Sequence, residues 1–119
     1  MQMIHKNEKG ELAVLGVFFK EGQKNAAFEK LAINFPSQKF KKMDLQGVNF
    51  NPAQLMPKTK HHYHYTGSLT TPPCSENVNW NVFNNAVELS AEQLSAFRGL
   101  YKNNYRPLQS LNDREVVNF

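Results

Sequence analysis

Two alternating segments on either side of a proline-stiffened turn constrain the fold of this 119-residue chain more than any other feature. Between residues 62 and 66 tyrosines alternate with histidines, and between residues 77 and 83 apolar side chains alternate with asparagines. A period of two is the pattern of a β-strand whose two faces differ. Between these segments lies Thr71-Pro72-Pro73, where the prolines fix φ and restrict the residue before each of them. The sequence therefore predicts two strands that flank a stiff loop.

The remaining segments predict a sheet with short helices at its edges. Residues 1–6 have a strand pattern, and the apolar run at residues 12–19 is typical of a central strand covered on both faces. Residues 25–32 predict a short helix, and turns are expected at Gln46-Gly47 and Asn51-Pro52. We therefore expect an α+β fold that is predominantly β.

Ser90 and Gln93 have the spacing of a capping box, which indicates the start of a second helix. The apolar stripe of that helix is expected at three positions: Leu94, Phe97 and Tyr101.

Composition and charge exclude two classes of partner. Fourteen basic and ten acidic side chains give a net charge of +4, but lysines such as Lys39, Lys42 and Lys60 are scattered along the chain. Nucleic-acid binding would require a denser basic stripe, so no nucleic-acid partner is expected. The apolar run at residues 12–19 is too short to span a bilayer, so no membrane partner is expected. No signal peptide follows Met1. The compartment stays open, and a longer parent protein could be periplasmic, secreted or cytoplasmic.

The segment from Tyr65 to Trp80 resembles the signature of α-class carbonic anhydrases. It contains Gly-Ser-Leu-Thr-Thr-Pro-Pro at residues 67–73, followed by Glu76, Val78 and Trp80 at the family's offsets. Further matches follow the family's order at residues 5–7, 10–19, 51–57 and 106–109. The resemblance covers essentially all 119 residues, but only the C-terminal half of the family's domain. It implies a single partial domain over residues 1–119, with a largely antiparallel central sheet and short peripheral helices.

The resemblance implies zinc-dependent, reversible hydration of carbon dioxide to bicarbonate. Such a reaction needs a hydroxide at neutral pH, an acceptor that orients it, and a dry pocket for an apolar gas. Zinc lowers the pKa of bound water to about 7, for which this family is itself the standard example. By position, Thr70 matches the family's gate threonine and Thr71 matches the neighbour that contacts bicarbonate.

The same resemblance assigns five apolar side chains to the carbon dioxide pocket. Alternation alone fits ordinary core packing equally well, so this assignment depends on the resemblance. The five positions are Leu12, Val14, Leu69, Val78 and Trp80.

The family's zinc ligands are three histidines, and none of them is matched by a histidine here. Two belong to an H-x-H strand in the family's first half, which this sequence lacks. The third position holds Gln2, whose neutral amide oxygen is a weaker zinc ligand than imidazole. The glutamate that accepts the gate threonine's proton also belongs to the first half. Zinc is expected for the intact family site, but no residue here is a confident ligand. We expect the chain alone to lose zinc and to be inactive.

A second H-x-H, at His62 and His64, lies outside the family's metal position. Two histidines are too few for a catalytic zinc site, so surface histidines on an edge strand are favoured over an adventitious metal site. The resemblance to bacterial-type members implies that Cys74 occupies a position that is often a cysteine bridged to one near the family's N-terminus. The sequence offers no second cysteine, which supports truncation and leaves a buried free thiol as the alternative.

Residues 1–6 already have a strand pattern, so we expect the chain to be truncated inside an element. Loss of the other half would expose strand edges and apolar faces. We therefore expect a homo-oligomer formed by strand exchange. A non-catalytic binding domain of the same family is the alternative function. The retention of Thr70, Thr71, Val14 and Trp80 favours the catalytic interpretation.

Overall fold

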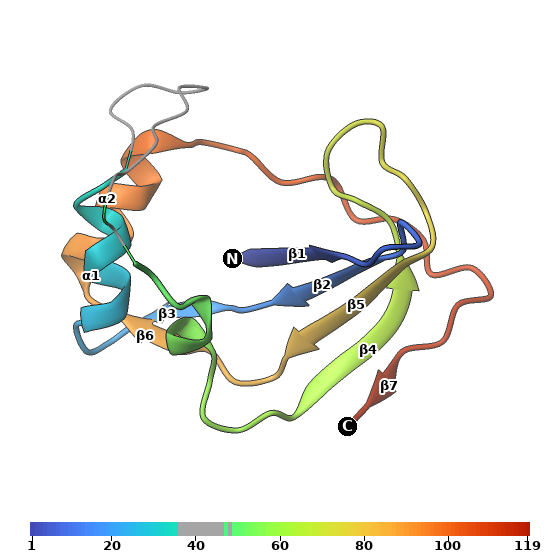
Figure 1. The fold of residues 1–119 in the computed structure, drawn as a ribbon, viewed down its shortest axis with the longest axis horizontal. Coiled ribbons are helices and arrows are strands. Elements are labelled where there is room, and N and C mark those ends of the chain that lie inside the picture. The colour runs from blue at the N-terminus through green and yellow to red at the C-terminus, as the bar shows by residue number, and fades with distance from the viewer. Residues whose placement is uncertain (36–46, 48) are drawn as a thin grey trace. The chain divides into compact units, whose positions relative to one another are not determined.

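The computed structural model describes residues 1–35, 47 and 49–119. Gln46 of the expected Gln46-Gly47 turn lies outside the described residues, as do Lys39 and Lys42. The elements run along the chain as shown in Figure 1: β1 (Gln2–Lys6), β2 (Leu12–Gly16), β3 (Phe19–Glu21), α1 (Ala26–Ala32), the 3₁₀ helix η1 (Pro52–Leu55), β4 (His62–Gly67), β5 (Val78–Phe83), β6 (Val87–Leu89), α2 (Ala91–Leu100) and β7 (Val117–Asn118). In the described ranges, neither α-helix combines the length and the apolar character needed to cross a membrane.

The chain divides into two compact units, which we call the sheet unit and the helix unit. The sheet unit consists of Met1–Phe18, Pro57–Ala86 and Tyr105–Phe119, and the helix unit consists of Phe19–Met56 and Val87–Asn104. The expectation of a single partial domain over residues 1–119 stays a prediction.

The sheet unit is built on a five-stranded sheet in the order β1-β2-β5-β4-β7. The pairs β1/β2, β4/β5 and β4/β7 are antiparallel, and β2/β5 is parallel. The predicted, largely antiparallel sheet is therefore confirmed, with one parallel pair at its centre. The two alternating segments of the sequence form the antiparallel neighbours β4 and β5, as Figure 1 shows.

The register of the sheet places one row of side chains across four strands. Ile4 pairs with Val14, Val14 with Trp80, and Trp80 with Tyr65. Directly paired residues project to the same face, so this face collects the apolar members of the alternating strands. Val14 and Val78 are completely buried there and Trp80 nearly so. Together they form the core of the sheet unit.

The helix unit has a separate core. Its two short strands, β3 and β6, are parallel. Phe28 of α1, Leu55 of η1 and Leu89 of β6 are buried against one another. The rings of Phe19 and Phe35 meet Phe28 edge to face, with centroids 5.5 and 5.8 Å away. This geometry is the favourable one for aromatic pairs.

The predicted starts of both helices are confirmed. Asn25 caps α1, since its side-chain oxygen accepts a hydrogen bond from the Phe28 amide. At α2, Ser90 and Gln93 form the reciprocal capping box. Tyr101 differs from the expectation, because α2 ends at Leu100 and Tyr101 is its extended C-cap.

The apolar run at residues 12–19 does not form one strand. It divides into β2, which ends at Gly16, and β3, which begins at Phe19. The two pieces belong to different sheets. Ala13 and Leu15, which project away from the buried face, are only partly buried. The prediction of one strand covered on both faces was therefore wrong, because the chain passes from one compact unit to the other within the run.

Candidate functional site

The loop between β4 and β5 is held in place at several points. The Ser68 carbonyl accepts a hydrogen bond from the Trp80 indole nitrogen at 3.0 Å, and the Ser68 hydroxyl accepts one from Arg106 Nη1 at 2.7 Å. Within the loop, the Thr71 carbonyl accepts from the Cys74 amide at 2.9 Å. The Pro72–Pro73 peptide bond is cis. These contacts fix the backbone that carries Thr70 and Thr71.

Gly67 is required where the loop leaves β4. A Cβ atom added at Gly67 would lie 2.9 Å from Trp80 Cδ1 and 3.0 Å from Tyr65 Cε2. These two rings stack in parallel, with centroids 6.0 Å apart. The absence of a side chain at Gly67 therefore lets the loop start directly over the indole ring.

Thr70 and Gln2 both line a cavity of about 670 Å³ in the sheet unit, and their side chains are in contact. Thr70 Oγ1 donates a hydrogen bond to Gln2 Oε1 at 3.2 Å. Trp80, Tyr65 and Val17 contribute to the apolar part of the cavity lining. The candidate gate residue therefore points into a cavity with an aromatic wall.

All five residues predicted for the substrate pocket lie together. Val14, Val78 and Trp80 form the buried cluster, and Leu12 and Leu69 pack against it. Of the five, Trp80 is the one that also lines the cavity with Thr70 and Gln2. Their role in holding a substrate stays a prediction.

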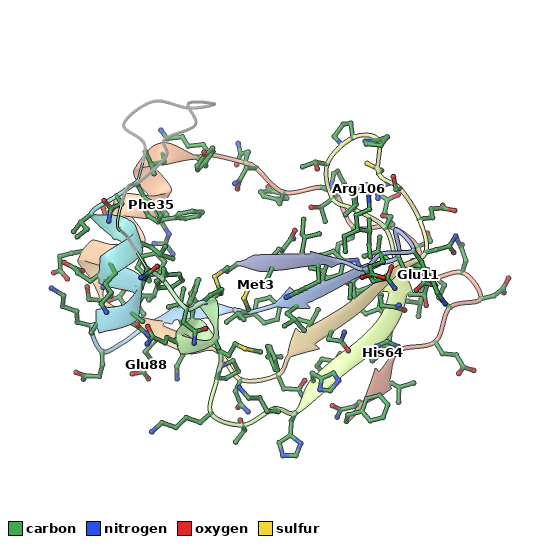
Figure 2. The ribbon with its side chains drawn as sticks, in the orientation of Figure 1. Met3, Glu11, Phe35, His64, Glu88 and Arg106 are labelled. Carbon is green, nitrogen blue, oxygen red and sulfur yellow. The ribbon has the colours of Figure 1, made fainter. Side chains whose placement is uncertain are left out.

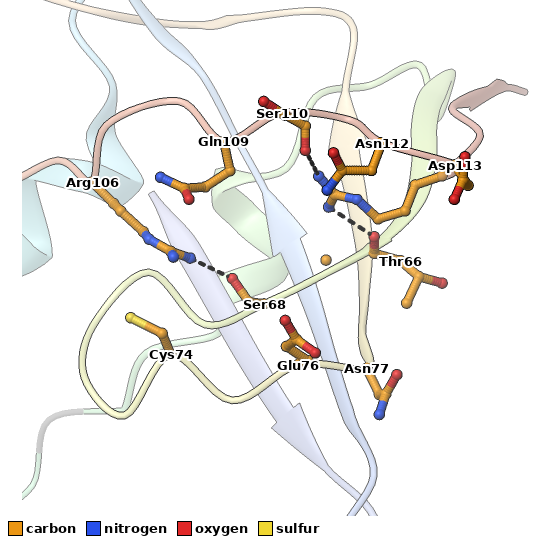
Figure 3. Close-up of a pocket in the computed structure, with 12 residues that line it drawn as sticks. Thr66, Ser68, Cys74, Glu76, Asn77, Arg106, Gln109, Ser110, Asn112 and Asp113 are labelled. Atoms are coloured by element: carbon orange, nitrogen blue, oxygen red, sulfur yellow. Dashed lines mark hydrogen bonds between the residues drawn. The ribbon is translucent and has the colours of Figure 1, made fainter.

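A second, polar cavity of about 620 Å³ lies in the same unit, and Figure 3 shows its lining. Arg114 links its walls: Nη1 donates to the Thr66 carbonyl at 3.2 Å, and Nη2 donates to the Ser110 carbonyl at 2.6 Å. Arg106, labelled in Figures 2 and 3, donates to Ser68 on the opposite side. Arg106 thus ties the C-terminal segment to the loop that carries Thr70, and Arg114 ties it to the end of β4.

Burial raises the pKa of the Tyr65 phenol, and the nearby Arg114 charge opposes that increase. Tyr65 lies beneath the loop and lines the cavity with Thr70. Its phenol is therefore neutral around physiological pH.

The described residues do not fit a zinc site. No group of three or more histidine, cysteine, aspartate or glutamate side chains in the described ranges is arranged to hold a metal ion. Gln2 occupies the position that the family uses for a ligand, but its amide oxygen accepts a hydrogen bond from the Thr70 hydroxyl. A catalytic zinc takes three protein ligands, and this part of the chain does not supply them.

His62 and His64 differ from the expectation of an edge strand. Their strand, β4, has β5 on one side and β7 on the other. His62 Nδ1 lies 2.7 Å from the Lys60 carbonyl, and His64 Nδ1 lies 3.0 Å from Asn81 Oδ1. The His62 ring stacks on Phe119, with centroids 5.4 Å apart. Both imidazoles are therefore engaged in local contacts, and Figure 2 shows His64 on its strand.

Sequence reasoning missed the roles of Arg106 and Arg114. Arg106 lies in a segment that matched the family, but the match carried no chemical role. Guanidinium contacts of this kind, to the Ser68 hydroxyl and to the Thr66 and Ser110 carbonyls, leave no periodic signal in a sequence. The Gln2–Thr70 contact was also missed, because its partners are 68 positions apart.

Comparison with known proteins identifies the relatives of this chain. Residues 2–119 match the family model described as eukaryotic-type carbonic anhydrase. The chain is 35% identical to a carbonic anhydrase of Nostoc, covering 98% of this chain and 44% of that protein. It is 38% identical to a carbonic anhydrase of Klebsiella pneumoniae, covering 98% and 48%.

Comparison with solved structures finds proteins of the same family. The α-carbonic anhydrase of Thermovibrio ammonificans, in complex with the inhibitor sulfanilamide, matches with a TM-score of 0.89 and 44% identity. The match covers 97% of this chain and 51% of that one. The chain thus spans about half the length of the relatives it matches. They include bacterial, plant and animal proteins, so a bacterial-type parent stays a prediction. They are named carbonic anhydrases and give no support to a non-catalytic alternative.

Proposed function

This chain belongs to the eukaryotic-type, or α-class, carbonic anhydrase family, and on that basis we propose that it forms the substrate wall and threonine gate of a site for reversible carbon dioxide hydration. One observation carries the proposal. Thr70, an exposed residue, lines the same cavity as Trp80, and its hydroxyl donates a hydrogen bond to Gln2 there.

The apolar residues of the sheet unit suit the substrate. Carbon dioxide offers no net charge to bind, so a dry apolar wall is the appropriate surface. Trp80 is the member of this wall that lines the cavity with Thr70. Val14 and Val78 support it from the buried core, and Leu12 and Leu69 pack against them. Packed side chains of this kind exclude water and hold one geometry.

The threonines supply the polar part of the site. Thr70 orients the attacking oxygen through its hydroxyl, and Thr71 contacts the bicarbonate that forms. Support comes from the anchored loop, in which the Trp80 indole and the Arg106 guanidinium both bind Ser68. A donor or acceptor fixed before reaction costs no reorganisation when charge develops.

Zinc is the family's metal, and we expect this chain alone not to retain it. Gln2 is engaged with Thr70, and no three-residue ligand group is present among the described residues. We expect the isolated chain to be inactive and to require a polypeptide that carries the family's first half.

A complementation experiment tests this function. The 119-residue chain is mixed with the first half of the Thermovibrio ammonificans protein, with zinc supplied, and carbon dioxide hydration is followed by stopped flow. The Gln2→His variant is tested in parallel because it provides an imidazole at the ligand position. Each half alone should show no hydration above the uncatalysed rate, and the mixture with Gln2→His should show the highest rate. A stable, zinc-loaded complex of that variant without hydration would disprove the proposal.

Self-association is the partner proposal. Strand β1 lies at the end of the strand order, and within the described residues its only neighbour is β2. Ile4 and Phe18 are 58% and 60% exposed. An exposed strand edge beside apolar side chains favours pairing with another copy. Light scattering at micromolar concentration should detect a dimer or larger species, and a monomer at all concentrations would contradict the proposal.

A further inference from the structure

We propose that Gln2 is a positioning residue for Thr70 and not a metal ligand. This inference rests on the proposed function only for its consequence in catalysis. Its structural content is the Thr70 Oγ1 to Gln2 Oε1 hydrogen bond, 3.2 Å long. The position that holds a metal ligand in the family thus holds the acceptor for the gate hydroxyl in this chain.

Both partners are carried by fixed backbone. Gln2 pairs with Gly16 at the end of the β1/β2 ladder, and the adjacent Met1 carbonyl accepts a hydrogen bond from the Val17 amide at 2.9 Å. Thr70 lies two residues after Ser68, which Trp80 and Arg106 bind. The contact therefore joins a strand end to an anchored loop.

The chemistry of the two groups fixes the direction of the hydrogen bond. An amide oxygen only accepts, so the Thr70 hydroxyl must donate. With respect to the described part of the chain, both lone pairs of the hydroxyl then remain available to accept from a ligand in the cavity, and the Gln2 Nε2 protons remain available as donors. Because Gln2 is uncharged, this arrangement places no net charge beside the apolar wall formed by Trp80.

The available ligands also favour this role over metal binding. Zinc prefers imidazole or thiolate to a neutral amide oxygen. No cluster of at least three histidine, cysteine or carboxylate side chains accompanies Gln2 in the residues that the structure describes. Hydrogen bonding to Thr70 is the interaction that Gln2 makes instead.

Nuclear magnetic resonance on the full 119-residue chain tests the proposal. Three-bond couplings report the χ1 rotamer of Thr70 in the native protein and in two variants at position 2. Gln2→Met keeps the shape but removes the acceptor, whereas Gln2→Glu keeps an acceptor. Gln109→Met is the matched control, since Gln109 lines the same cavity but binds the Pro107 carbonyl.

We expect one Thr70 rotamer in the native chain, in Gln2→Glu and in Gln109→Met, and a mixture of staggered rotamers in Gln2→Met. An unchanged Thr70 rotamer in Gln2→Met would overturn the proposal, as would the same mixture in Gln109→Met. A titration of the native chain with zinc ions gives a second readout. The Gln2 side-chain amide signals should not shift, and a saturable shift would show that Gln2 is a ligand.

These measurements require no catalysis. Loss of the proposed hydration activity in the complementation experiment would leave the rotamer result intact. Conversely, an unchanged Thr70 rotamer in Gln2→Met would leave the hydration result for the Gln2→His complex intact.

Discussion

Two glutamines illustrate how differently the two compact units are built. In the helix unit, Gln93 is 4% exposed and its amide makes four hydrogen bonds, to Asn25, Ser90 and Glu29. In the sheet unit, Gln2 is exposed and uses its amide oxygen to accept from Thr70. Gln93 is satisfied and structural, whereas the Gln2 Nε2 donors have no hydrogen-bond partner among the residues that the structure describes.

The hydrophobic cores of the two units also differ in whether they contain predicted site residues. In the helix unit, aromatic rings and leucines pack around Phe28, and this cluster includes none of the predicted site residues. In the sheet unit, the core residues Val14, Val78 and Trp80 are also the predicted substrate wall. We infer that the helix unit supports the fold, while stability and function depend on the same residues in the sheet unit.

Removal of one large ring from each core should produce the largest effects. Trp80→Ala and Phe28→Ala should each lower the free energy of unfolding by about 3–5 kcal/mol, because each leaves a cavity in a packed core. Urea denaturation measures both. In the complemented protein, Trp80→Ala should also lower the hydration rate beyond its effect on folded population, whereas Phe28→Ala should not. Equal rates for the two variants after correction for folding would erase the distinction between the units.

The same glycine substitution should have opposite effects in the two units. Gly67→Ala should destabilise by about 1–3 kcal/mol, since the new Cβ would overlap the Trp80 ring. Gly99 lies in α2, and apart from the neighbouring backbone of that helix no described residue comes within 4 Å of an added Cβ. Gly99→Ala should therefore stabilise by up to about 1 kcal/mol. Thermal unfolding of both variants checks the signs, and stabilisation by Gly67→Ala would show that the loop does not start over the indole.

The smallest effects should appear in the pH dependence of folding stability, which Glu29 in the helix unit and Tyr65 in the sheet unit should change at opposite ends of the pH range. The pKa of Glu29 is held below its ordinary value of 4.5, chiefly by the Gln93 hydrogen bond and then by Lys24. A depressed folded-state pKa gives stability that is present above pH 4.5 and lost as the pH falls through the folded value. Burial raises the pKa of Tyr65 above 10.0. That contribution is present below pH 10.0 and lost as the pH rises through the folded value.

Two conservative variants separate these contributions. Glu29→Gln should flatten the acid side of the stability profile, and Tyr65→Phe should flatten the alkaline side. Chemical denaturation across the pH range measures both. If Glu29→Gln changed the stability profile only at high pH, the assignment of the acid-side loss of stability to Glu29 would be contradicted.

Patterns with a short period predicted much of the fold. Strict alternation located β4 and β5, and local capping chemistry located the starts of α1 and α2, because these signals involve residues close in sequence. The apolar run at residues 12–19 was misread. Hydrophobicity alone carries no mark of the point where a chain passes from one sheet to another.

The candidate site was predicted only in part. The signature segment identified Thr70 and Trp80, which the structure places at one cavity. The Gln2 acceptor and the Arg114 link are contacts between segments distant in sequence. Their geometry depends on strand register and loop anchoring, which no local pattern encodes.

The hydration rate of a Thr70→Val variant tests the central claim most directly. The substitution is made in the Gln2→His chain complemented with the family's first half, and Thr59→Val serves as the matched control outside the cavity. Loss of the orienting hydroxyl should lower the rate by on the order of 100-fold, while Thr59→Val leaves it unchanged. Equal rates for the two variants, both folded and zinc-loaded, would show that Thr70 is not the gate of this site.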